Sequence, residues 1–270
     1  MSSNLIGRWR NDYGSLLDIQ VKGPGGTFSG TYSSETGESG TYLMRGCSPD
    51  LLDVNQAFSL TVSWRPCRPT DDTPPQPSWH WVSTMAGVMF IDTPDRQPVV
   101  RLLHCLVAST AQASAQVTRP AVYTETLTLL RAPNDALSPR GHRIDFARGG
   151  RSVKSCRLLL TNTDAASCFR YLELVTDADG SCVGTVASGP EARSAVHGFL
   201  DSNPPAHLQS LALTALVDPD GSSSVCLAGF VDLTTSIAKL TLSHANAVRY
   251  ENKWTAISVH QESFTVKRLA

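Results

Sequence analysis

The fold is decided by Gly7-Arg-Trp-Arg-Asn-Asp-Tyr-Gly-Ser15 and, after a glycine turn, by Gly26-Thr-Phe-Ser-Gly-Thr-Tyr-Ser-Ser34. Both segments are strand-like, and glycines separate them. They place an amide, several hydroxyls and an indole on what we expect to be the first strands of an antiparallel barrel. Such side chains suit the binding of a small polar heterocycle better than the breaking of a bond.

The composition excludes several classes of protein. With 23 basic and 24 acidic residues, the balance argues against nucleic-acid binding and against a role at a membrane surface. No apolar run approaches the roughly 18 residues of a membrane-spanning helix. The start, Met1-Ser-Ser-Asn, lacks the basic and apolar regions of a signal peptide. We therefore expect a cytoplasmic protein, with secretion as the alternative if a leader was removed.

The seven cysteines are interpreted as reduced thiols that pack as small hydrophobic side chains. Their number is odd, no two form a Cys-x-x-Cys motif, and most lie in apolar or strand-like segments. This spacing predicts neither a zinc site nor a thioredoxin-like redox motif. Reduced thiols favour a reducing compartment.

Alternation with a period of two dominates the chain and predicts an all-β protein. Phe58, Leu60, Val62 and Trp64 share one face, and small or polar side chains occupy the other, which is typical of a half-buried strand. Short strands separated by Gly, Pro and Asp turns predict a barrel or a sandwich. The five prolines in residues 66–77 predict a loop, because proline lacks the N–H that a sheet requires.

An internal repeat predicts two similar domains. Gly26-Thr-Phe-Ser-Gly-Thr-Tyr32 is echoed by Gly180-Ser-Cys-Val-Gly-Thr-Val186, and Glu125-Thr-Leu-Thr-Leu-Leu-Arg131 by Glu262-Ser-Phe-Thr-Val-Lys-Arg268. Gly87-Val-Met-Phe-Ile-Asp92 is likewise echoed by Ala228-Gly-Phe-Val-Asp232, and three echoes in one order indicate a tandem duplication. We expect two eight-stranded antiparallel up-and-down barrels, over residues 1–131 and 156–270, joined by a linker over residues 132–155.

The first repeat resembles the avidin and streptavidin family of biotin-binding proteins. The two opening segments carry the resemblance, together with Phe58-Ser-Leu-Thr-Val-Ser-Trp64 and Gly87-Val-Met-Phe-Ile-Asp92, and it covers residues 5–131. The second repeat matches in outline, best over residues 252–265. What the resemblance implies is a tandem of avidin-like barrels, the second degenerate, with non-catalytic binding of biotin or a biotin-like ligand in the first.

The resemblance implies a set of ligand-binding residues in the first barrel. Asn11, Ser15 and Tyr32 stand where family members donate hydrogen bonds to the ureido oxygen of the ligand. Three donors that converge on one carbonyl favour the build-up of charge on its oxygen. Ser34 stands where family members accept a hydrogen bond from one ureido N–H.

At the other end of the ligand the sequence departs from the family pattern. Trp64 matches an indole that walls the ligand ring, and Ser83 matches a hydroxyl near its sulfur. His104, however, stands where a second wall indole is expected, Glu125 where an Asn or Asp pairs with the other ureido N–H, and Val117 at the lid tryptophan. Because a lost aromatic anchor commonly costs about 2 kcal/mol or more, we expect weaker binding than in typical family members.

The second repeat is more eroded, so no equivalent pocket is expected there. Val186 stands at the position of Tyr32, and aliphatic side chains replace Trp64. Trp254 nevertheless remains at the lid position. We therefore expect the second barrel to lend Trp254 as a cap for the pocket of the first, which makes one chain a pseudo-dimer with one working site.

The residues themselves leave other roles open. Asn11 and Ser15 could satisfy a turn at the barrel rim, Tyr32 and Trp64 could pack in the barrel, and Trp254 could lie in an interface. His104 could be a satisfied barrel histidine, and Glu125, which shares a face with the apolar side chains of its strand, could form a salt bridge at the barrel mouth. Trp9 is expected in the core, and His80, after the proline loop, on an exposed loop.

Catalysis is not expected from this chain. Cys105 and His104 are neighbours on a predicted strand and therefore point to opposite faces. No nucleophile–base pair, pair of inward carboxylates or phosphate-binding glycine motif is recognised. No cofactor or metal is expected, while self-association through barrel faces follows from the resemblance. The alternatives to biotin binding are an assembly protein with vestigial pockets and a lipocalin-like carrier of another small ligand.

Overall fold

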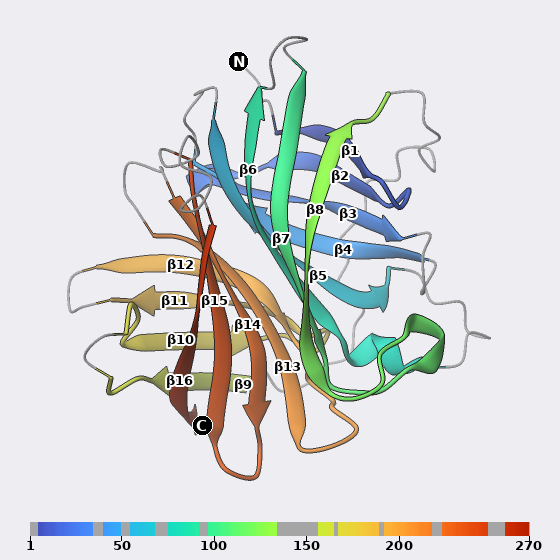
Figure 1. The fold of residues 1–270 in the computed structure, drawn as a ribbon. Coiled ribbons are helices and arrows are strands. Elements are labelled where there is room, and N and C mark those ends of the chain that lie inside the picture. Colours follow the sequence, from blue (N-terminus) through green and yellow to red (C-terminus); the bar gives the residue numbers. More distant parts are fainter. Residues whose placement is uncertain are drawn as a thin grey trace.

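The computed structural model describes residues 5–34, 40–49, 55–67, 75–91, 97–133, 156–164, 167–188, 192–217, 223–247 and 257–269. Within these ranges sixteen β-strands make up almost all of the regular structure (Figure 1). The first eight are β1 (Gly7–Asn11), β2 (Leu16–Lys22), β3 (Thr27–Ser34), β4 (Gly40–Cys47), β5 (Gln56–Pro66), β6 (Val82–Ile91), β7 (Pro98–Ala108) and β8 (Ala121–Arg131). The second eight are β9 (Cys156–Thr161), β10 (Tyr171–Thr176), β11 (Ser181–Ala187), β12 (Arg193–Leu200), β13 (Leu208–Leu216), β14 (Ser223–Asp232), β15 (Ile237–Asn246) and β16 (Ile257–Leu269).

The strands form two closed barrels of eight strands each. From β1 to β8 each strand pairs antiparallel with the next one along the chain, and β1 pairs with β8 to close the ring. The second barrel is built in the same way, with β9 paired to both β10 and β16. The predicted all-β class and the antiparallel eight-stranded barrels are thereby confirmed. Residues 134–155, most of the expected linker, lie outside the described residues.

Helical structure is confined to short 3₁₀ turns in the described part of the chain. These are η1 (Pro24–Gly26), η2 (Pro77–His80) and η3 (Ala113–Ala115). In the ranges given above, no helix has the length and apolar character that crossing a membrane requires.

The core of each barrel is filled by the apolar side chains that the alternating pattern assigns to its inner face. Phe58, Leu60 and Trp64 of β5 belong to the first core, and the second core is built in the same way from β9 to β16. Trp9 is fully buried in the first core, as expected, and its indole Nε1 donates a hydrogen bond to the carbonyl oxygen of Leu5 at 2.9 Å.

The outer face of β5 is also buried, because the second barrel packs against it. Ala57 of β5 clusters with Ala86 of β6 and with Cys226 and Ala245 of the second barrel. A neighbouring cluster again joins both barrels through Val82, Cys105, Val107, Phe199, Ala212 and Ala228. The prediction of a half-buried strand is therefore wrong. Alternation identifies the apolar face of a strand, but it does not show that small side chains on the other face meet a second domain.

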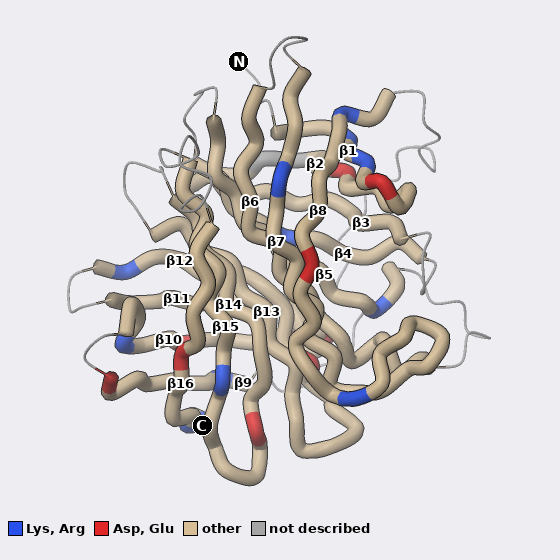
Figure 2. Tube along the Cα trace, viewed as in Figure 1, with Lys and Arg blue, Asp and Glu red and all other residues tan. Residues whose placement is uncertain are grey.

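Neutral hydroxyl and thiol groups occupy the centre of this contact. Ser59 of β5 hydrogen-bonds with Thr214 of β13 and Ser224 of β14, and Cys47 Sγ lies 3.0 Å from Thr214 Oγ1. Burial raises the pKa of the Cys47 thiol, so this group stays uncharged. β6 and β13 hold no charged residue and β14 only Asp232 at its end (Figure 2). The barrels thus meet through a surface that needs no buried ion pair at its centre.

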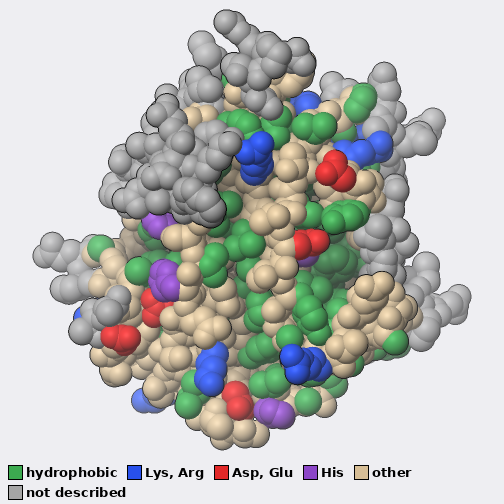
Figure 3. All heavy atoms as spheres, viewed as in Figure 1, with side chains coloured by type: hydrophobic (Ala, Val, Ile, Leu, Met, Phe, Trp, Pro, Cys, Tyr) green, Lys and Arg blue, Asp and Glu red, His purple; other side chains and the backbone are tan. Residues whose placement is uncertain are grey.

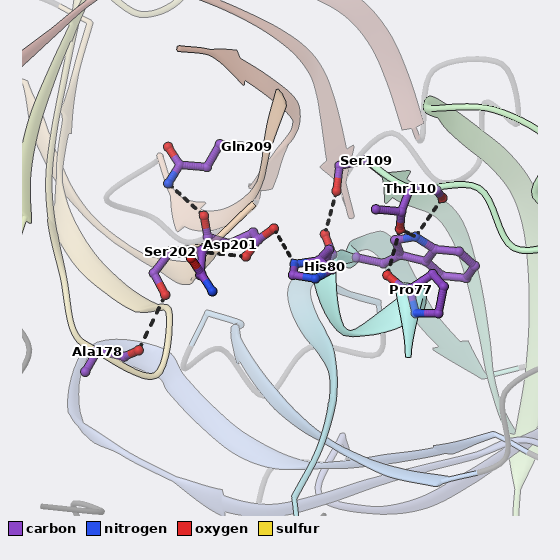
Figure 4. A network of polar contacts seen from close by, with 10 residues as sticks. Pro77, His80, Ser109, Thr110, Ala178, Asp201, Ser202 and Gln209 are labelled. Carbon is purple, nitrogen blue, oxygen red and sulfur yellow. Dashed lines mark hydrogen bonds and ion pairs between the residues drawn. The ribbon is translucent and has the colours of Figure 1, made fainter. Parts of the chain in front are cut away.

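A polar contact ties η2 to the second barrel (Figure 4). His80 Nδ1 lies 3.0 Å from Asp201 Oδ2, and Ser109 Oγ donates a hydrogen bond to the His80 carbonyl oxygen at 3.1 Å. The Gln209 amide nitrogen in turn donates to the Asp201 carbonyl oxygen at 2.7 Å. The expectation that His80 lies on an exposed loop is wrong, because its side chain is partly covered by a partner from the other barrel.

Candidate functional site

A cavity of about 490 Å³ opens at one end of the first barrel. In Figure 3 an acidic side chain and a histidine lie together at the edge of a hollow lined by hydrophobic side chains, in the region where Figure 1 shows β8. Side chains from the barrel strands and from two loops line the cavity: Asn11, Tyr13, Ser15, Tyr32, Ser34, Trp64, Trp81, His104, Leu106, Ser114, Ala115, Gln116 and Glu125. The lining therefore combines a polar end with aromatic and apolar walls.

Asn11 organises the turn that carries the polar end of the cavity. Its Oδ1 accepts hydrogen bonds from the backbone N–H groups of Tyr13, at 3.1 Å, and Ser15, at 2.9 Å. Asn11 ends β1, and this Asx-type turn leads the chain back into β2. Because the carbonyl oxygen is used by the backbone, the amide N–H groups are what Asn11 can offer to a ligand. The rim role and the ligand-binding role of Asn11 are thus compatible.

Tyr32 lies next to this turn as a buried, neutral phenol. Burial raises the pKa of Tyr32, and the nearby carboxylate of Glu125 adds to the rise, while a hydrogen bond with the Ser15 hydroxyl opposes it. The Tyr32 ring meets the Trp64 indole edge-on, with the ring centroids 5.9 Å apart. Tyr32 therefore packs in the barrel and also presents a hydroxyl to the cavity.

A row of hydrogen bonds crosses four neighbouring strands along the other wall. Trp64 Nε1 lies 2.7 Å from Ser83 Oγ, which lies 2.9 Å from His104 Nε2, and His104 Nδ1 lies 2.8 Å from Glu125 Oε1. The sheet register explains the last contact, since His104 of β7 stands directly opposite Glu125 of β8. We call these four residues the β5–β8 polar row.

The donor and acceptor of each hydrogen bond in the polar row follow from Trp64 and Glu125, the residues at the two ends of the row. The indole N–H of Trp64 can only donate, so Ser83 Oγ accepts from it. The ionised carboxylate of Glu125 can only accept, so the proton of His104 lies on Nδ1. With His104 Nε2 as the acceptor of the Ser83 hydroxyl proton, each contact in the row has one donor and one acceptor. His104 is thereby a satisfied barrel histidine that also lines the cavity.

Glu125 is held as a carboxylate at the cavity edge. The hydrogen bond from His104 lowers the pKa of Glu125, against a smaller opposing effect of partial burial. The side chain is 47% exposed, so one part of the carboxylate contacts His104 while another remains accessible. Both roles left open by the sequence, an ion pair at the mouth and an acceptor for a ligand, are compatible with this position.

The polar row has the order of a Ser–His–acid triad, but its geometry does not suit nucleophilic attack. Ser83 is fully buried, and it is not among the residues that line the cavity. Its Oγ already accepts the Trp64 N–H and donates to His104 in the assignment above. A nucleophile must reach a substrate carbonyl at about 3 Å, and the indole and imidazole cover this hydroxyl instead. The row positions the wall of the cavity.

The connection between β7 and β8 covers part of the cavity mouth. It contains η3, and its residues Ser114, Ala115 and Gln116 line the cavity. Gln116 has a φ of 59°, in the left-handed region, where the chain turns back so that Val117 can bridge to Gln112. Val117, at the position of the family's lid tryptophan, is buried and is not among the lining residues.

The structure brings together most of the residues that the sequence singled out. Those that line the cavity are Asn11, Ser15, Tyr32, Ser34, Trp64, His104 and Glu125. Ser83 lies behind them and reaches the cavity only through Trp64 and His104. Trp254 lies outside the described residues, so its role as a cap stays a prediction.

Other lining residues were missed because loops bring them to the cavity. Tyr13 and residues 114–116 carry no spacing signal that points to a site. Trp81 was not missed, because the resemblance places it at a hydroxyl position near the ligand; it follows η2, and its indole Nε1 donates a hydrogen bond to Thr110 Oγ1 at 2.8 Å. Leu106 could have been found, since it lies two residues beyond His104 on the same face of β7.

The second barrel also contains a cavity, of about 670 Å³, which the sequence did not predict. Its wall is apolar where the first barrel is aromatic, with Val186, Leu216 and Val217 in the lining. Gly25, Thr27 and Cys47 of the first barrel complete part of the wall. Aliphatic side chains thus replace the aromatic ones in the second barrel, as expected, but a cavity remains where no equivalent pocket was expected.

The polar end of the second barrel is occupied by its own carboxylate. Asn162 follows β9 as Asn11 ends β1, and its Oδ1 likewise accepts the backbone N–H two residues on, at 2.9 Å. Its Nδ2 and the Ser167 Oγ both donate to Glu262 Oε2, each at 2.7 Å. Leu240 stands opposite Glu262, in the place that His104 takes opposite Glu125. With no histidine at the opposite position on β15, this carboxylate satisfies the donors that the first barrel leaves to its cavity.

Comparison with known proteins returns one family and a set of related folds. The Avidin family model matches residues 1–73. Among solved structures, the chain is similar to the crystal structure of Xenavidin, with 21% identity and a TM-score of 0.37 over 49% of this chain and 100% of that one. It is also similar to the X-ray structure of biotin binding protein from chicken, with 19% identity and a TM-score of 0.37 over 48% of this chain and 97% of that one. No curated protein matches the sequence.

Proposed function

Since an Avidin family match over residues 1–73 and two closed eight-stranded barrels fit a tandem avidin-like protein, we propose that the first barrel binds biotin or a biotin-like ligand. The observation that carries the proposal is the meeting of Asn11, Ser15 and Tyr32 at one end of a single cavity. Its volume of about 490 Å³ is within the range of about 300–1,000 Å³ that small-molecule sites occupy.

The polar end supports recognition of a ureido carbonyl. The Asn11 amide has its carbonyl oxygen bonded to the backbone, which leaves N–H groups for the ligand. The hydroxyls of Ser15 and Tyr32 hydrogen-bond to one another, and each can turn its proton from this contact toward a ligand oxygen. Because both side chains are buried and already positioned, ordering them costs little entropy when the ligand arrives.

The opposite wall supports a ligand with an N–H group and an apolar body. Glu125 is charged and partly accessible, so it can accept a hydrogen bond from a ligand N–H. Trp64, Trp81 and Leu106 provide aromatic and apolar contact surface. His104 provides an imidazole where a wall indole would bury more apolar area, so affinity below that of typical family members is part of the proposal.

The proposed activity is binding without catalysis. The one serine–histidine–carboxylate row of the described cavity has its hydroxyl buried behind two rings. Binding through shape, oriented hydrogen bonds and ring contacts uses all of the residues at the polar end and needs no nucleophile.

Calorimetric titration of the full chain with biotin tests the proposal. We expect one ligand per chain, and we expect Tyr32→Phe and Ser15→Ala each to weaken binding by about 10-fold, because each removes a buried donor worth about 1.5 kcal/mol. A ligand at 100-fold excess over Kd should also stabilise the fold by about 2.7 kcal/mol.

Ser33→Ala is the matched control for Ser15→Ala. Ser33 lies between Tyr32 and Ser34 on β3, but its hydroxyl pairs with Thr41 Oγ1 at 3.3 Å, away from the cavity lining. Its loss should leave biotin binding unchanged. Absence of binding heat, together with a melting temperature that excess biotin does not move, would overturn the proposal and favour an assembly protein with vestigial pockets.

A further inference from the structure

A cysteine, a histidine and a glutamate of the second barrel converge at the edge of its cavity. His260 and Glu262 lie two residues apart on β16 and so share one face, and Cys168 precedes β10. Cys168 Sγ lies 3.7 Å from His260 Nε2, which lies 3.3 Å from Glu262 Oε1, and the three donor atoms all lie within 4.8 Å of one another. Cys168 and His260 also line the 670 Å³ cavity.

Two of these separations match the edges of a tetrahedral coordination sphere. Zinc binds thiolate sulfur at about 2.3 Å and nitrogen or carboxylate oxygen at about 2.0–2.2 Å. Ligand atoms at those distances around a tetrahedral ion are about 3.3–3.7 Å apart. The sulfur–nitrogen and nitrogen–oxygen distances of this cluster have those lengths, and the sulfur and the carboxylate oxygen lie within 4.8 Å of one another, so all three atoms can reach one ion.

The carboxylate is held with one oxygen turned toward the histidine and thiol. Glu262 is buried, and its Oε2 accepts hydrogen bonds from Asn162 Nδ2 and Ser167 Oγ at 2.7 Å. Its Oε1 faces His260 and also accepts the backbone N–H of Cys168 at 3.3 Å. Carboxylates that bind metals are commonly oriented by such outer hydrogen bonds.

We propose that Cys168, His260 and Glu262 form a zinc site with its fourth position open to water. The donor set decides the metal, because a thiolate and an imidazole suit Zn²⁺, whereas Mg²⁺ and Ca²⁺ require oxygen ligands. Three protein ligands with one exchangeable position are the arrangement of accessible zinc sites. Two of the three ligands line the cavity, so the fourth position opens onto that space.

Among the described residues, this cluster has no counterpart in the first barrel. In the first barrel the equivalent carboxylate, Glu125, pairs with His104, and the Asn11–Ser15 turn contains no cysteine. The proposal does not depend on biotin binding.

Metal titration of the full, chelator-treated chain in a non-thiol reductant tests this site. We expect one Zn²⁺ per chain by calorimetry, and Co²⁺ should give the visible absorption of a tetrahedral ion with a sulfur-to-metal charge-transfer band. Cys168→Ser and His260→Ala should remove the tight site, and Asn162→Ala should weaken it by about 10-fold because it loosens Glu262.

Matched controls separate this site from adventitious binding to the other thiols. Cys156→Ser removes another partly accessible cysteine of the second barrel, and His207→Ala an exposed histidine, so both should keep full affinity. Cys168 and His260 are exposed, so their variants leave the core intact, which circular dichroism checks. Equal zinc affinity in the native chain and in Cys168→Ser, or a Co²⁺ spectrum without a sulfur band, would overturn the proposal.

Discussion

His104 joins three strands of the first barrel through one imidazole ring. Its two nitrogens contact Ser83 of β6 and Glu125 of β8, and the backbone of the residue belongs to β7. The ring thereby fixes the rotamer of Glu125 and, through Ser83, supports the Trp64 indole. The resemblance implies an aromatic wall at this position. His104 replaces it with a wall of hydrogen-bonded polar side chains.

Glu125→Gln should remove an acid-dependent part of the stability. The hydrogen bond from His104 holds the pKa of Glu125 below its ordinary value of 4.5, so the folded state keeps the charge longer than the unfolded chain as the pH falls. This contribution is present above pH 4.5 and is lost as the pH falls through the lowered pKa of the folded state. Because Glu125 is half exposed, we expect a modest effect.

Urea unfolding of both proteins between about pH 7 and about pH 3 measures this contribution. The midpoint of the native chain should fall more steeply in acid than that of Glu125→Gln. Parallel pH curves would show that His104 does not hold the carboxylate.

At the scale of the strand, the glycines that recur in both repeats have a geometric reason. Gly26 and Gly180 lie in the turns before β3 and β11, with φ of 73° and 84°. The carbonyl oxygen of each accepts a backbone N–H, from Ser48 at 2.8 Å and from Leu200 at 2.7 Å. Residues other than glycine rarely adopt this left-handed backbone conformation, which explains why both repeats have glycine at this position.

The second recurring pair, Gly30 and Gly184, marks a close approach between strands. A Cβ atom at Gly30 would lie 1.9 Å from the Asp18 carbonyl oxygen of β2, and one at Gly184 would lie 1.8 Å from that of Glu173 on β10. Backbone atoms cannot move aside as the end of a side chain can. The glycines shared by the two repeated segments are therefore explained by the close approach of neighbouring strands in each barrel.

Gly184→Ala should destabilise the second barrel by about 1–3 kcal/mol, because the methyl group must push β10 and β11 apart. Thr185→Ala is the control, since Thr185 is the exposed neighbour on β11, and it should change stability by about 0.5 kcal/mol or less. Urea unfolding followed by circular dichroism compares the two. Equal midpoints would contradict the close approach.

At the scale of the whole molecule, the two barrels form one packed body. The centre of their contact is made of apolar, hydroxyl and thiol side chains, and the second cavity takes part of its wall from the first barrel. The chain therefore has the tandem two-barrel arrangement that the sequence predicted, while the expected cap, Trp254, and residues 134–155 of the expected linker lie outside the described residues. Association of further copies through the remaining faces stays a prediction.

Ala228→Arg should weaken this contact strongly. Ala228 is buried between the barrels, in a cluster with Ala212 and Phe199, and the members of this cluster offer no acidic partner to a guanidinium. An unpaired buried charge costs several kcal/mol, so we expect a loss of about 3 kcal/mol or more. Val183→Arg is the control, because Val183 is 46% exposed. Calorimetric melting temperatures that fall equally in both variants would contradict the packing.

Sequence reasoning succeeded where the information is local. Alternation at Phe58, Leu60 and Trp64 assigns the inner face of β5, and Glu125 points toward the cavity as its place beside Leu127 indicates. It failed where a second domain or a loop was involved, as at the covered outer face of β5, at His80 and at the loop residues of the cavity. Periodicity indicates which side chains share a face of a strand, but it does not indicate what packs against that face.

By itself the sequence determined the strands, because a period of two and a turn glycine act over a few residues. The internal repeat indicated two barrels, and the positions at the polar end of the first cavity followed from the resemblance to the avidin family. Only the tertiary structure decided the partners of the equivalent carboxylates, with Glu125 on His104 and Glu262 on Asn162 and Ser167. It also brought Cys168 to His260, 92 residues away in sequence. Such contacts arise from strand register and barrel closure, which depend on the whole sheet, and no short segment encodes them.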